Sequence, residues 1–380
     1  MTKKVSDSET IAVVGDLHLG PKCENASIRS RLVTSQESYL MSLPEKWKSM
    51  GIDTVVFAGD VFTTRTAIAV ETMEFALKFF GDALKEFEVY LIAGNHDFPY
   101  ENSSTMTSLR PLGLLPNVHL FVDTVGKAKL AGHTWYFLPW VIPEKFGEVG
   151  AWFSKLAKKP RETVDNTVIV GHLDIFGALM EAGQLSQAGF EASQVSAAAG
   201  TVFSGHYHCR SRIEGDPGTI TYLGSPYHLS FAHVGTDCGY SLFMSDGTVK
   251  FIENTECPRF VDCVDDDLES GEPDNIQGNF VRFFLKDGRQ FADCAILKAK
   301  LEELGPLHIK TVPYGADDDV GEVRVADDEE TRRLLNSDQL GMAEIYLDKY
   351  PEKLPKLASG EDPKKKILQF LKEYGEKSGK

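Results

Sequence analysis

Short runs of apolar residues alternate with amphipathic stretches along the first 250 positions of the chain. Runs rich in Val, Ile and aromatic residues are typical of buried strands. They lie at 10–14, 54–58, 89–93, 135–138, 167–170, 201–204, 220–223, 240–244 and 249–252. Helical spacing of apolar residues predicts helices over 31–50 and 66–87. Alternation of strand and helix predicts an α/β layered domain.

The pattern changes after position 254. The stretch 262–274 holds seven acidic residues and no basic one, which is typical of a solvated loop or linker. A strand at 279–285, a helix at 292–304 and a strand at 308–312 predict a small α+β domain. Helical patterns follow at 331–347 and 363–374. We therefore divide the chain into a domain at 1–256, a small domain at 257–316, an acidic linker at 317–330 and a helical region at 331–380.

Composition narrows the class of protein. The 380 residues are 42% hydrophobic and 25% charged, which are values of an ordinary soluble globular protein. No apolar run approaches the roughly 18 residues needed to span a bilayer, and the N-terminus lacks the apolar core of a signal peptide. The six cysteines form no CxxC pair, so we interpret them as reduced thiols. We expect a cytoplasmic protein.

The formal net charge of −16 taken alone argues against a nucleic-acid partner, because phosphate contacts need Lys and Arg. Its distribution weakens that argument. Residues 1–250 carry 27 acidic and 21 basic residues, a net of −6, whereas the acidic blocks 262–274 and 317–330 together carry −14. The first domain therefore faces no large net repulsion from DNA. It is not basic either, so we expect weak DNA affinity from this chain alone.

Five predicted strands end in Gly followed by a residue that can bind a metal ion. In an open α/β sheet, ligands bind beyond the carboxyl ends of the strands, so we expect these side chains to converge. Two further histidines lie close by in the sequence. The seven residues are Asp16, His18, Asp60, Asn95, His172, His206 and His208. This donor mixture suits Mn, Fe or Zn rather than Ca, and seven ligands suit two ions about 3.5–4 Å apart.

His96 directly follows a predicted ligand and is expected at the edge of the metal pair. From there it can donate a proton to a leaving oxygen or stabilise charge on a phosphate. The alternatives are an eighth ligand and a structural hydrogen-bonding group. Five other histidines lack the strand-end context and are interpreted as core or surface residues. They are His119, His133, His228, His233 and His308.

The motifs GDLH, GDVF, GNHD, GH and GHYH resemble the five signature motifs of the calcineurin-like metallophosphoesterases. The segments GDLHLGPK, GDVFTTR and GNHDFPY are most similar to the SbcD-type DNA repair nucleases, and among them to the nuclease subunit of bacteriophage recombination endonucleases. The resemblance implies an α/β fold with a four-layer sandwich of two mixed β-sheets flanked by helices. It also implies a small α+β capping domain and a C-terminal helical partner-binding segment.

The resemblance further implies how the ligands divide between two divalent ions, with Mn²⁺ expected and Mg²⁺ as the alternative. One ion would be bound by Asp16, His18 and His208, the other by Asn95, His172 and His206, with Asp60 as the bridge. His96 would serve the leaving group. Cellular members carry a His at the position of Thr63, which leaves the balance of exonuclease and endonuclease activity open.

The implied function is a two-metal DNA nuclease, a 3′–5′ exonuclease on duplex ends and an endonuclease on single strands. It would act in a recombination and double-strand-break repair complex with an SMC-like coiled-coil ABC ATPase, as a homodimer, in the cytoplasm and without a membrane. Candidate DNA contacts follow the first two motifs and are Lys22, Arg29, Arg31 and Arg65. A candidate apolar face for the ATPase is formed by Ile367, Leu368, Phe370 and Leu371, which can instead dock on their own domain.

Two rival functions fit parts of the sequence. A metal-dependent phosphodiesterase or phosphatase acting on a small molecule explains the five motifs and the acidic surface, but not the extra small domain. A scaffold that has lost its metals would be expected to lack ligands, and here all seven positions are filled. Mixed His, Asp and Asn sites accept several metals, so the sequence leaves the physiological ion open.

Overall fold

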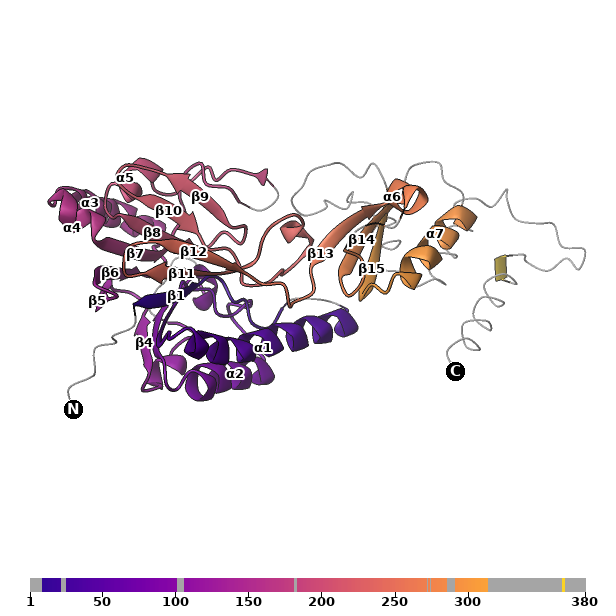
Figure 1. Cartoon of the computed structure of the whole chain (residues 1–380), viewed down its shortest axis with the longest axis horizontal. Helices are drawn as coiled ribbons and strands as arrows, with labels where there is room; N and C mark the ends of the chain where they lie inside the picture. Colours follow the sequence, from indigo (N-terminus) through magenta and orange to yellow (C-terminus); the bar gives the residue numbers. More distant parts are fainter. Residues whose placement is uncertain are drawn as a thin grey trace, which may run out of the picture. The chain divides into compact units, whose positions relative to one another are not determined.

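The computed structural model describes residues 9–21, 25–100, 106–180, 183–271, 273, 275–285, 291–313 and 364–365 (Figure 1). The chain divides into two compact units. Unit 1 comprises Met1–Asp262, Asp274–Val281 and Leu301–His308. Unit 2 comprises Cys263–Pro273, Arg282–Lys300 and Ile309–Lys380.

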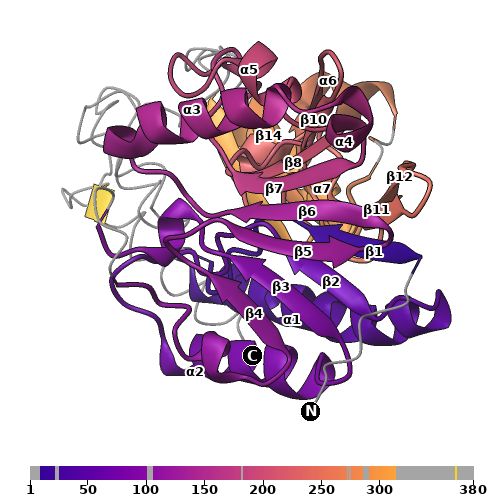
Figure 2. The same ribbon diagram turned by 90° about the vertical axis from the view of Figure 1, so that its left-hand side faces the viewer.

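Two six-stranded mixed sheets form the centre of unit 1 (Figure 2). The first has the order β12-β11-β1-β2-β3-β4, in which β1 to β4 are parallel neighbours and β11 and β12 are antiparallel. Its strands are β1 Thr10–Val14, β2 Thr54–Phe57, β3 Glu88–Ile92, β4 Val118–Phe121, β11 Gly239–Met244 and β12 Val249–Glu253.

The second sheet has the order β5-β6-β7-β8-β10-β9. Strands β6, β7, β8 and β10 are parallel neighbours, and β5 and β9 pair antiparallel at the two edges. Its strands are β5 Gly126–Leu130, β6 His133–Leu138, β7 Thr167–His172, β8 Thr201–Gly205, β9 Ser211–Glu214 and β10 Thr219–Tyr222. The parallel centres of both sheets bring several strand carboxyl ends to one region, which is where a site is expected.

Helices cover the outer face of each sheet, and apolar side chains fill the space between the sheets (Figure 2). Val13 and Val56 of the first sheet pack in one buried cluster with Trp135 and Val170 of the second. Each such aliphatic side chain contributes about 1.5–3 kcal/mol by leaving water. The helices are α1 Ala26–Ser49 and α2 Val70–Leu77 on the first sheet, and α3 Phe146–Ala157, α4 Arg161–Asp165 and α5 Ala192–Ser196 near the second. The predicted four-layer α/β sandwich is confirmed.

Three strands of unit 1, β4, β5 and β9, were not predicted from the sequence. Strands β5 and β9 are edge strands with the sequences GKAKL and SRIE, whose charged side chains hide the apolar pattern. Edge strands tolerate such residues because one side meets solvent. The other strands begin or end within two residues of the predicted bounds.

Both predicted helices of the first domain differ from the structure at their ends. Helix α1 begins at Ala26 rather than at position 31, because Asn25 caps it by accepting hydrogen bonds from the amides of Ser27 and Ile28. The helix predicted over 66–87 is shorter. It comprises α2 and a π-helical segment, Lys78–Ala83, that buries Phe79 and Phe80. Both aromatic rings lie in the apolar core, each in edge contact with Phe57.

A three-stranded sheet in the order β13-β14-β15 lies in the C-terminal half of the chain, with strands Phe260–Val264, Phe280–Leu285 and His308–Pro313. Helix α7, Phe291–Glu303, accompanies it, so the predicted strand-helix-strand order is found, with β13 added. The interpretation of 262–274 as a loop or linker was wrong for residues 262–270, because β13 continues to Val264 and a helix follows it. Helix α6, Asp265–Ser270, forms there because carboxylates favour a helix N-terminus and Leu268 is buried.

Several predictions concern residues outside the described ranges. These are Lys22, the linker 317–330 and the ATPase-facing residues Ile367, Leu368, Phe370 and Leu371. The predicted domain boundaries also stay predictions. In the part of the chain that the structure describes, no helix combines the length and the apolar character needed to cross a membrane.

Candidate metal centre

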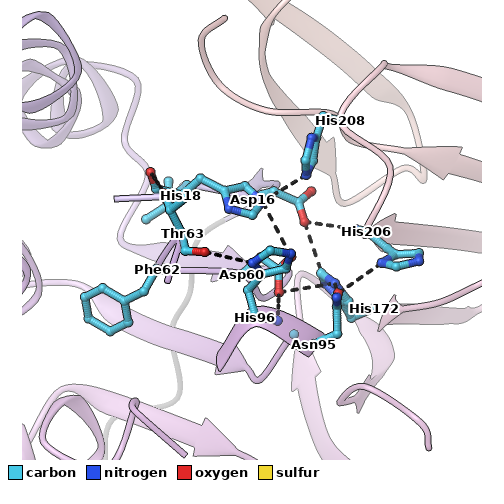
Figure 3. Close-up of polar contacts among 12 residues, drawn as sticks. Asp16, His18, Asp60, Phe62, Thr63, Asn95, His96, His172, His206 and His208 are labelled. Atoms are coloured by element: carbon cyan, nitrogen blue, oxygen red, sulfur yellow. Dashed lines mark hydrogen bonds and ion pairs between the residues drawn. The ribbon is translucent and has the colours of Figure 1, made fainter. Parts of the chain in front are cut away.

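The seven predicted ligands lie together at the carboxyl ends of strands from both sheets (Figure 3). The loops that follow β1, β2 and β3 carry four of them, and we call these the first-sheet loops: residues 15–20, 59–65 and 94–97. The end of β7 and the loop after β8 carry the other three, and we call these the second-sheet loops: residues 171–174 and 205–208. All seven except His206 and His208 are buried.

Four of the residues form one tight group. One donor atom from each of Asp16, His18, Asp60 and His208 lies within 4.8 Å of every other. The Nε2 atoms of His18 and His208 are 2.9 Å apart, and His18 Nε2 lies 3.5 Å from Asp60 Oδ2. Asp16 Oδ2 is buried without a hydrogen-bond partner among the described residues. A buried carboxylate oxygen in that state is costly unless a cation compensates it.

The remaining three residues form a second group around an amide oxygen. Asn95 Oδ1 lies 2.8 Å from His172 Nε2 and 3.0 Å from His206 Nδ1. His172 Nε2 is also 3.4 Å from Asp60 Oδ1, so Asp60 reaches both groups through its two oxygens. The seven side chains therefore lie together in two neighbouring groups that both contact Asp60. The ligand roles themselves stay a proposal.

Hydrogen bonds behind the ligands hold their orientation. His172 Nδ1 donates to the carbonyl of Ala58 at 2.8 Å, so Nε2 is the ring nitrogen that faces Asn95 and Asp60. Asp16 Oδ1 accepts the amide hydrogen of His206 at 2.9 Å. Such partners fix the tautomer and the ring plane of a metal-binding histidine.

Burial governs the protonation of these groups. It raises the pKa of Asp16 to about 6 and lowers the pKa of His206 to about 3. Burial and the neighbouring His208 also hold the pKa of His18 well below its usual value. His18 and His206 are therefore neutral near pH 7, which is the form in which imidazole binds metals.

Asp60 and His172 behave as a pair. Burial disfavours the charge on both, but their mutual attraction outweighs it, so the pKa of Asp60 is lowered and that of His172 is raised to about 9. The proton on His172 thus depends on the carboxylate charge beside it. A dication next to Asp60 would compete with that proton, because ligand binding and protonation use the same lone pair.

The backbone at the site is strained. His18, Asp60 and His206 have positive φ values of 45°, 50° and 92°, and they account for three of the five described non-glycine residues with a positive φ. Such conformations cost about 1–3 kcal/mol each and cluster at functional sites. Gly94 is required for close approach, because a Cβ there would lie 2.2 Å from Asp60 Oδ1.

The donor set fits two divalent cations. It combines four imidazoles, two carboxylates and one amide oxygen, the mixture that suits first-row transition metals. His172 Nε2 and Asn95 Oδ1 lie 2.8 Å apart, and His172 Nδ1 is engaged by the Ala58 carbonyl, so a cation that displaces the Nε2 proton would meet two donor atoms side by side. A second cation would compensate the buried Asp16 Oδ2, which has no hydrogen-bond partner among the described residues.

His96 lies beside the first group rather than within it. Its backbone amide donates to Asp60 Oδ1 at 2.8 Å, and its ring stands edge-on to the His18 ring at a centroid distance of 5.0 Å. Its Nδ1 lies 2.9 Å from the carbonyl oxygen of Thr63. This position agrees with the predicted place of His96 at the edge of the two metal positions. Its role as a proton donor stays a prediction.

Asp97 is a functional residue that the sequence prediction missed. It is fully buried, and its carboxylate accepts hydrogen bonds from the amides of Val61, Phe62 and Gly94 at 3.0, 3.4 and 2.9 Å. It thereby ties the loop after β2 to the loop after β3. Burial and the charge of Asp60 raise the pKa of Asp97 above its ordinary value, against the backbone amide donors, which favour the charged form. Its position in the motif GNHD, directly after His96, is the sequence feature from which its place at the centre could have been predicted.

Trp140 was also missed, because it follows β6 without the Gly-ligand pattern. Its ring lies 5.0 Å from the His206 ring and 6.0 Å from the His172 ring, between centroids. Its amide donates to the carbonyl of Ala93, next to Gly94. Trp140 therefore backs the second ligand group from a third strand end of the second sheet.

Two histidines interpreted as core residues lie near the centre. The His233 ring is 5.6 Å from the His208 ring, and His228 lies beside His233. His228 Nδ1 accepts the amide hydrogen of Phe260 at 3.2 Å, and its Nε2 lies 3.1 Å from the carbonyl oxygen of Thr236. With both ring nitrogens engaged by the backbone, His228 has a structural role, in keeping with the prediction.

The candidate DNA contacts are less closely associated with the centre. Arg29 and Arg31 are exposed near the start of α1, and Arg65 is partly exposed on the loop after β2. Lys22 lies outside the described residues. None of the three described arginines takes part in the contacts that join the seven ligands.

Comparison with known proteins assigns the family. Residues 9–210, more than half of the chain, match the model of the calcineurin-like phosphoesterases. The chain belongs to this family. Its members are phosphoesterases, so the chain is a phosphoester hydrolase by class. It is also 28% identical over 246 residues to exonuclease subunit 1 of Enterobacteria phage T4, covering 63% of this chain and 66% of that relative. The match thus spans slightly less than two thirds of the relative's length.

Two solved structures are similar to this chain at lower sequence identity than the T4 relative. A dimetal phosphatase from Danio rerio is 11% identical with a TM-score of 0.38, over 62% of this chain and 92% of the other. The phosphopantetheinyl hydrolase of Mycobacterium tuberculosis is 15% identical with a TM-score of 0.37, over 57% and 90%. At such scores the likeness supports no further conclusion.

Proposed function

We propose that the chain is a two-metal DNA nuclease. The observation that carries this proposal is the convergence of seven donors from five strand ends into two groups that share Asp60. The family is one of phosphoesterases, and the T4 relative is named an exonuclease subunit, which supports a nucleic-acid phosphodiester as substrate.

In this proposal Asp16, His18 and His208 hold one ion, Asn95, His172 and His206 hold the other, and Asp60 bridges them. Bound there, two divalent ions, Mn²⁺ by preference, supply an activated water and a clamp for the phosphoryl oxygens. The hydrogen bonds from His172 to Ala58 and from His206 to Asp16 keep the donors aimed inward.

His96 is the proposed proton donor to the leaving oxygen. Its amide is held by Asp60 and its Nδ1 by the Thr63 carbonyl, which leaves Nε2 as the atom available for proton transfer. General acids of this kind contribute about 10²–10⁴-fold. Arg29, Arg31, Arg65 and Lys22 are the proposed phosphate contacts, which would position the strand without reading its sequence.

The wider setting is also a proposal. The word subunit in the name of the T4 relative supports action within a complex, for which we propose an SMC-like coiled-coil ABC ATPase and a second copy of this chain. The region 331–380, with Ile367, Leu368, Phe370 and Leu371, is the proposed ATPase-binding part. Recombination or double-strand-break repair in the cytoplasm, that of the host for a phage chain, is the proposed process.

The deciding experiment measures nucleotide release from linear duplex DNA and cleavage of circular single strands, with Mn²⁺, Mg²⁺ or chelator. We expect Mn²⁺-dependent cleavage that increases when the ATPase partner is added. Asp60→Asn is the matched control, because it keeps the side-chain size and removes the bridging charge.

Cleavage of bis-p-nitrophenyl phosphate without cleavage of DNA, with and without the ATPase, would favour the small-molecule phosphodiesterase instead. Absence of bound metal after soaking in Mn²⁺, with no cleavage of either substrate, would point to a scaffold.

A further inference from the structure

Thr63 connects two parts of the centre that are distant in sequence. Its hydroxyl donates to the carbonyl of His18 at 2.7 Å, and its amide donates to the carbonyl of Leu19 at 3.0 Å. Its own carbonyl lies 2.9 Å from His96 Nδ1 (Figure 3). One residue outside the seven ligands therefore contacts both the His18 segment and the proposed proton donor.

The contact with His96 determines which ring nitrogen carries the hydrogen. A carbonyl oxygen only accepts hydrogen bonds, so Nδ1 of His96 must be the donor. The neutral ring is then the Nδ1–H tautomer, and Nε2 has a free lone pair. In the protonated ring Nε2 carries the hydrogen that can be transferred. The Thr63 carbonyl thus selects the nitrogen that exchanges protons with substrate.

The side chain of Thr63 holds that carbonyl in place. The loop after β1 and the loop after β2 run side by side, since His18 donates its amide to Asp60 at 3.0 Å and Leu19 donates to Val61 at 2.8 Å. His18 has a φ of 45°, which places its carbonyl outside any regular ladder. The Thr63 hydroxyl donates a hydrogen bond to this carbonyl oxygen. Without the hydroxyl, the segment that presents the Thr63 carbonyl loses one of its anchors.

We infer that Thr63 is a positioning residue for leaving-group protonation, an inference that rests on the proposed function. A water gives up one proton to solvent, and as the resulting hydroxide oxygen bonds to phosphorus, the bond from phosphorus to the leaving oxygen breaks and its electron pair stays on that oxygen. The Nε2 hydrogen of protonated His96 moves to the oxygen. The ring is left neutral as the Nδ1–H tautomer, still bound to Thr63.

The test compares Thr63→Val, which removes the hydroxyl at nearly constant shape, with Thr63→Ser, which keeps it. Thr64→Val is the matched control, because the hydroxyl of this neighbouring residue donates to the carbonyl of Ala67. On DNA we expect Thr63→Val to lower kcat about three- to tenfold with KM unchanged, the range of one lost hydrogen bond. Thr63→Ser and Thr64→Val should stay within about twofold of wild type.

Substrate chemistry separates positioning of His96 from a general structural defect. The p-nitrophenolate of bis-p-nitrophenyl phosphate leaves without a proton, so Thr63→Val should change its kcat by less than about twofold. In a His96→Ser background, Thr63→Val should cause no further loss on DNA. An equal loss on both substrates, or additive losses in the double variant, would overturn the inference, as would a fall in bound Mn²⁺.

A measurement independent of activity keeps this inference separate from the proposed function. With ¹⁵N-labelled histidine, the nitrogen shifts of His96 should report a single Nδ1–H tautomer in wild type and a mixture in Thr63→Val. A wild-type protein that cleaves neither substrate would refute the proposed nuclease but leave this result standing. An Nε2–H tautomer in wild type, or no change in the variant, would refute the role of Thr63.

Discussion

The two sets of loops that build the centre are held together in different ways. The first-sheet loops are cross-linked by backbone hydrogen bonds from His18 and Leu19 and by the buried Asp97 carboxylate. The second-sheet loops reach the centre mainly through imidazole rings, backed by Trp140. Across the sheets, His18 contacts His208 and Asn95 contacts both His172 and His206. Backbone groups take part as well, in the contacts of His172 with the Ala58 carbonyl and of the His206 amide with Asp16. The first-sheet loops are thus joined to one another by backbone hydrogen bonds, and we propose that they form the frame on which the second-sheet loops complete ion binding.

The largest effect is expected where the two sets meet. Asp60→Asn removes the charge that both ligand groups share, and it leaves an amide facing His172 and His18. We expect Mn²⁺ content to fall by half or more and DNA cleavage to drop below detection, measured by metal analysis and nuclease assay. Retained metal with full activity would mean that Asp60 is not the bridge.

His96→Ser is expected to have the next largest effect. Because His96 lies beside the ligand groups, bound Mn²⁺ should stay near the wild-type level while DNA cleavage falls by about 10²–10⁴-fold. Single-turnover cleavage and metal analysis on the same preparation check this. Parallel loss of metal and activity would make His96 a ligand.

Asp97→Asn tests the frame directly. The side-chain NH₂ group of the new asparagine would face backbone N–H groups that donate to the Asp97 carboxylate in the wild type, and two donors cannot pair. We therefore expect the free energy of unfolding to fall by about 1–3 kcal/mol. Loss of loop support should lower kcat about 10- to 100-fold, as for partners that orient metal ligands. Urea unfolding and nuclease kinetics measure the two effects.

Asp174→Asn is the matching change in the second-sheet loops. Asp174 accepts from the hydroxyls of Ser186 at 2.8 Å and of Tyr207, not from the backbone of a ligand loop. Its effect on kcat should therefore be smaller than that of Asp97→Asn. Equal losses from the two variants would show that the loops share the frame role.

The smallest effect is expected for Arg29→Gln and Arg31→Gln, on the helix that covers the first sheet. If each arginine contacts a phosphate, each substitution lowers the slope of log affinity against log salt by about 1, with kcat at saturation unchanged. Fluorescence anisotropy with labelled duplex at several salt concentrations measures the slope. An unchanged slope in both variants would place DNA elsewhere.

The sequence predicted the parts of the centre that depend on local pattern. The apolar runs of β1 and β7 are each followed by a Gly and then by a proposed ligand, Asp16 or His172. Edge strands β5 and β9 were missed, because charged residues occupy every second position and few large apolar side chains remain. Helix α6 was missed, because its acidic residues were interpreted as a solvated segment although they favour a helix N-terminus.

The sequence by itself determined the α/β class and placed seven candidate ligands at strand ends, since both follow from short-range periodicity and residue chemistry. Only the tertiary structure decided which nitrogen of His172 and His96 faces the centre, because each ring is fixed by a backbone carbonyl more than 30 positions away. The contacts of Thr63, Asp97 and Trp140 at the centre were likewise decided only by the tertiary structure. Their partners lie on other strand ends, and the packing of two sheets brings those ends together.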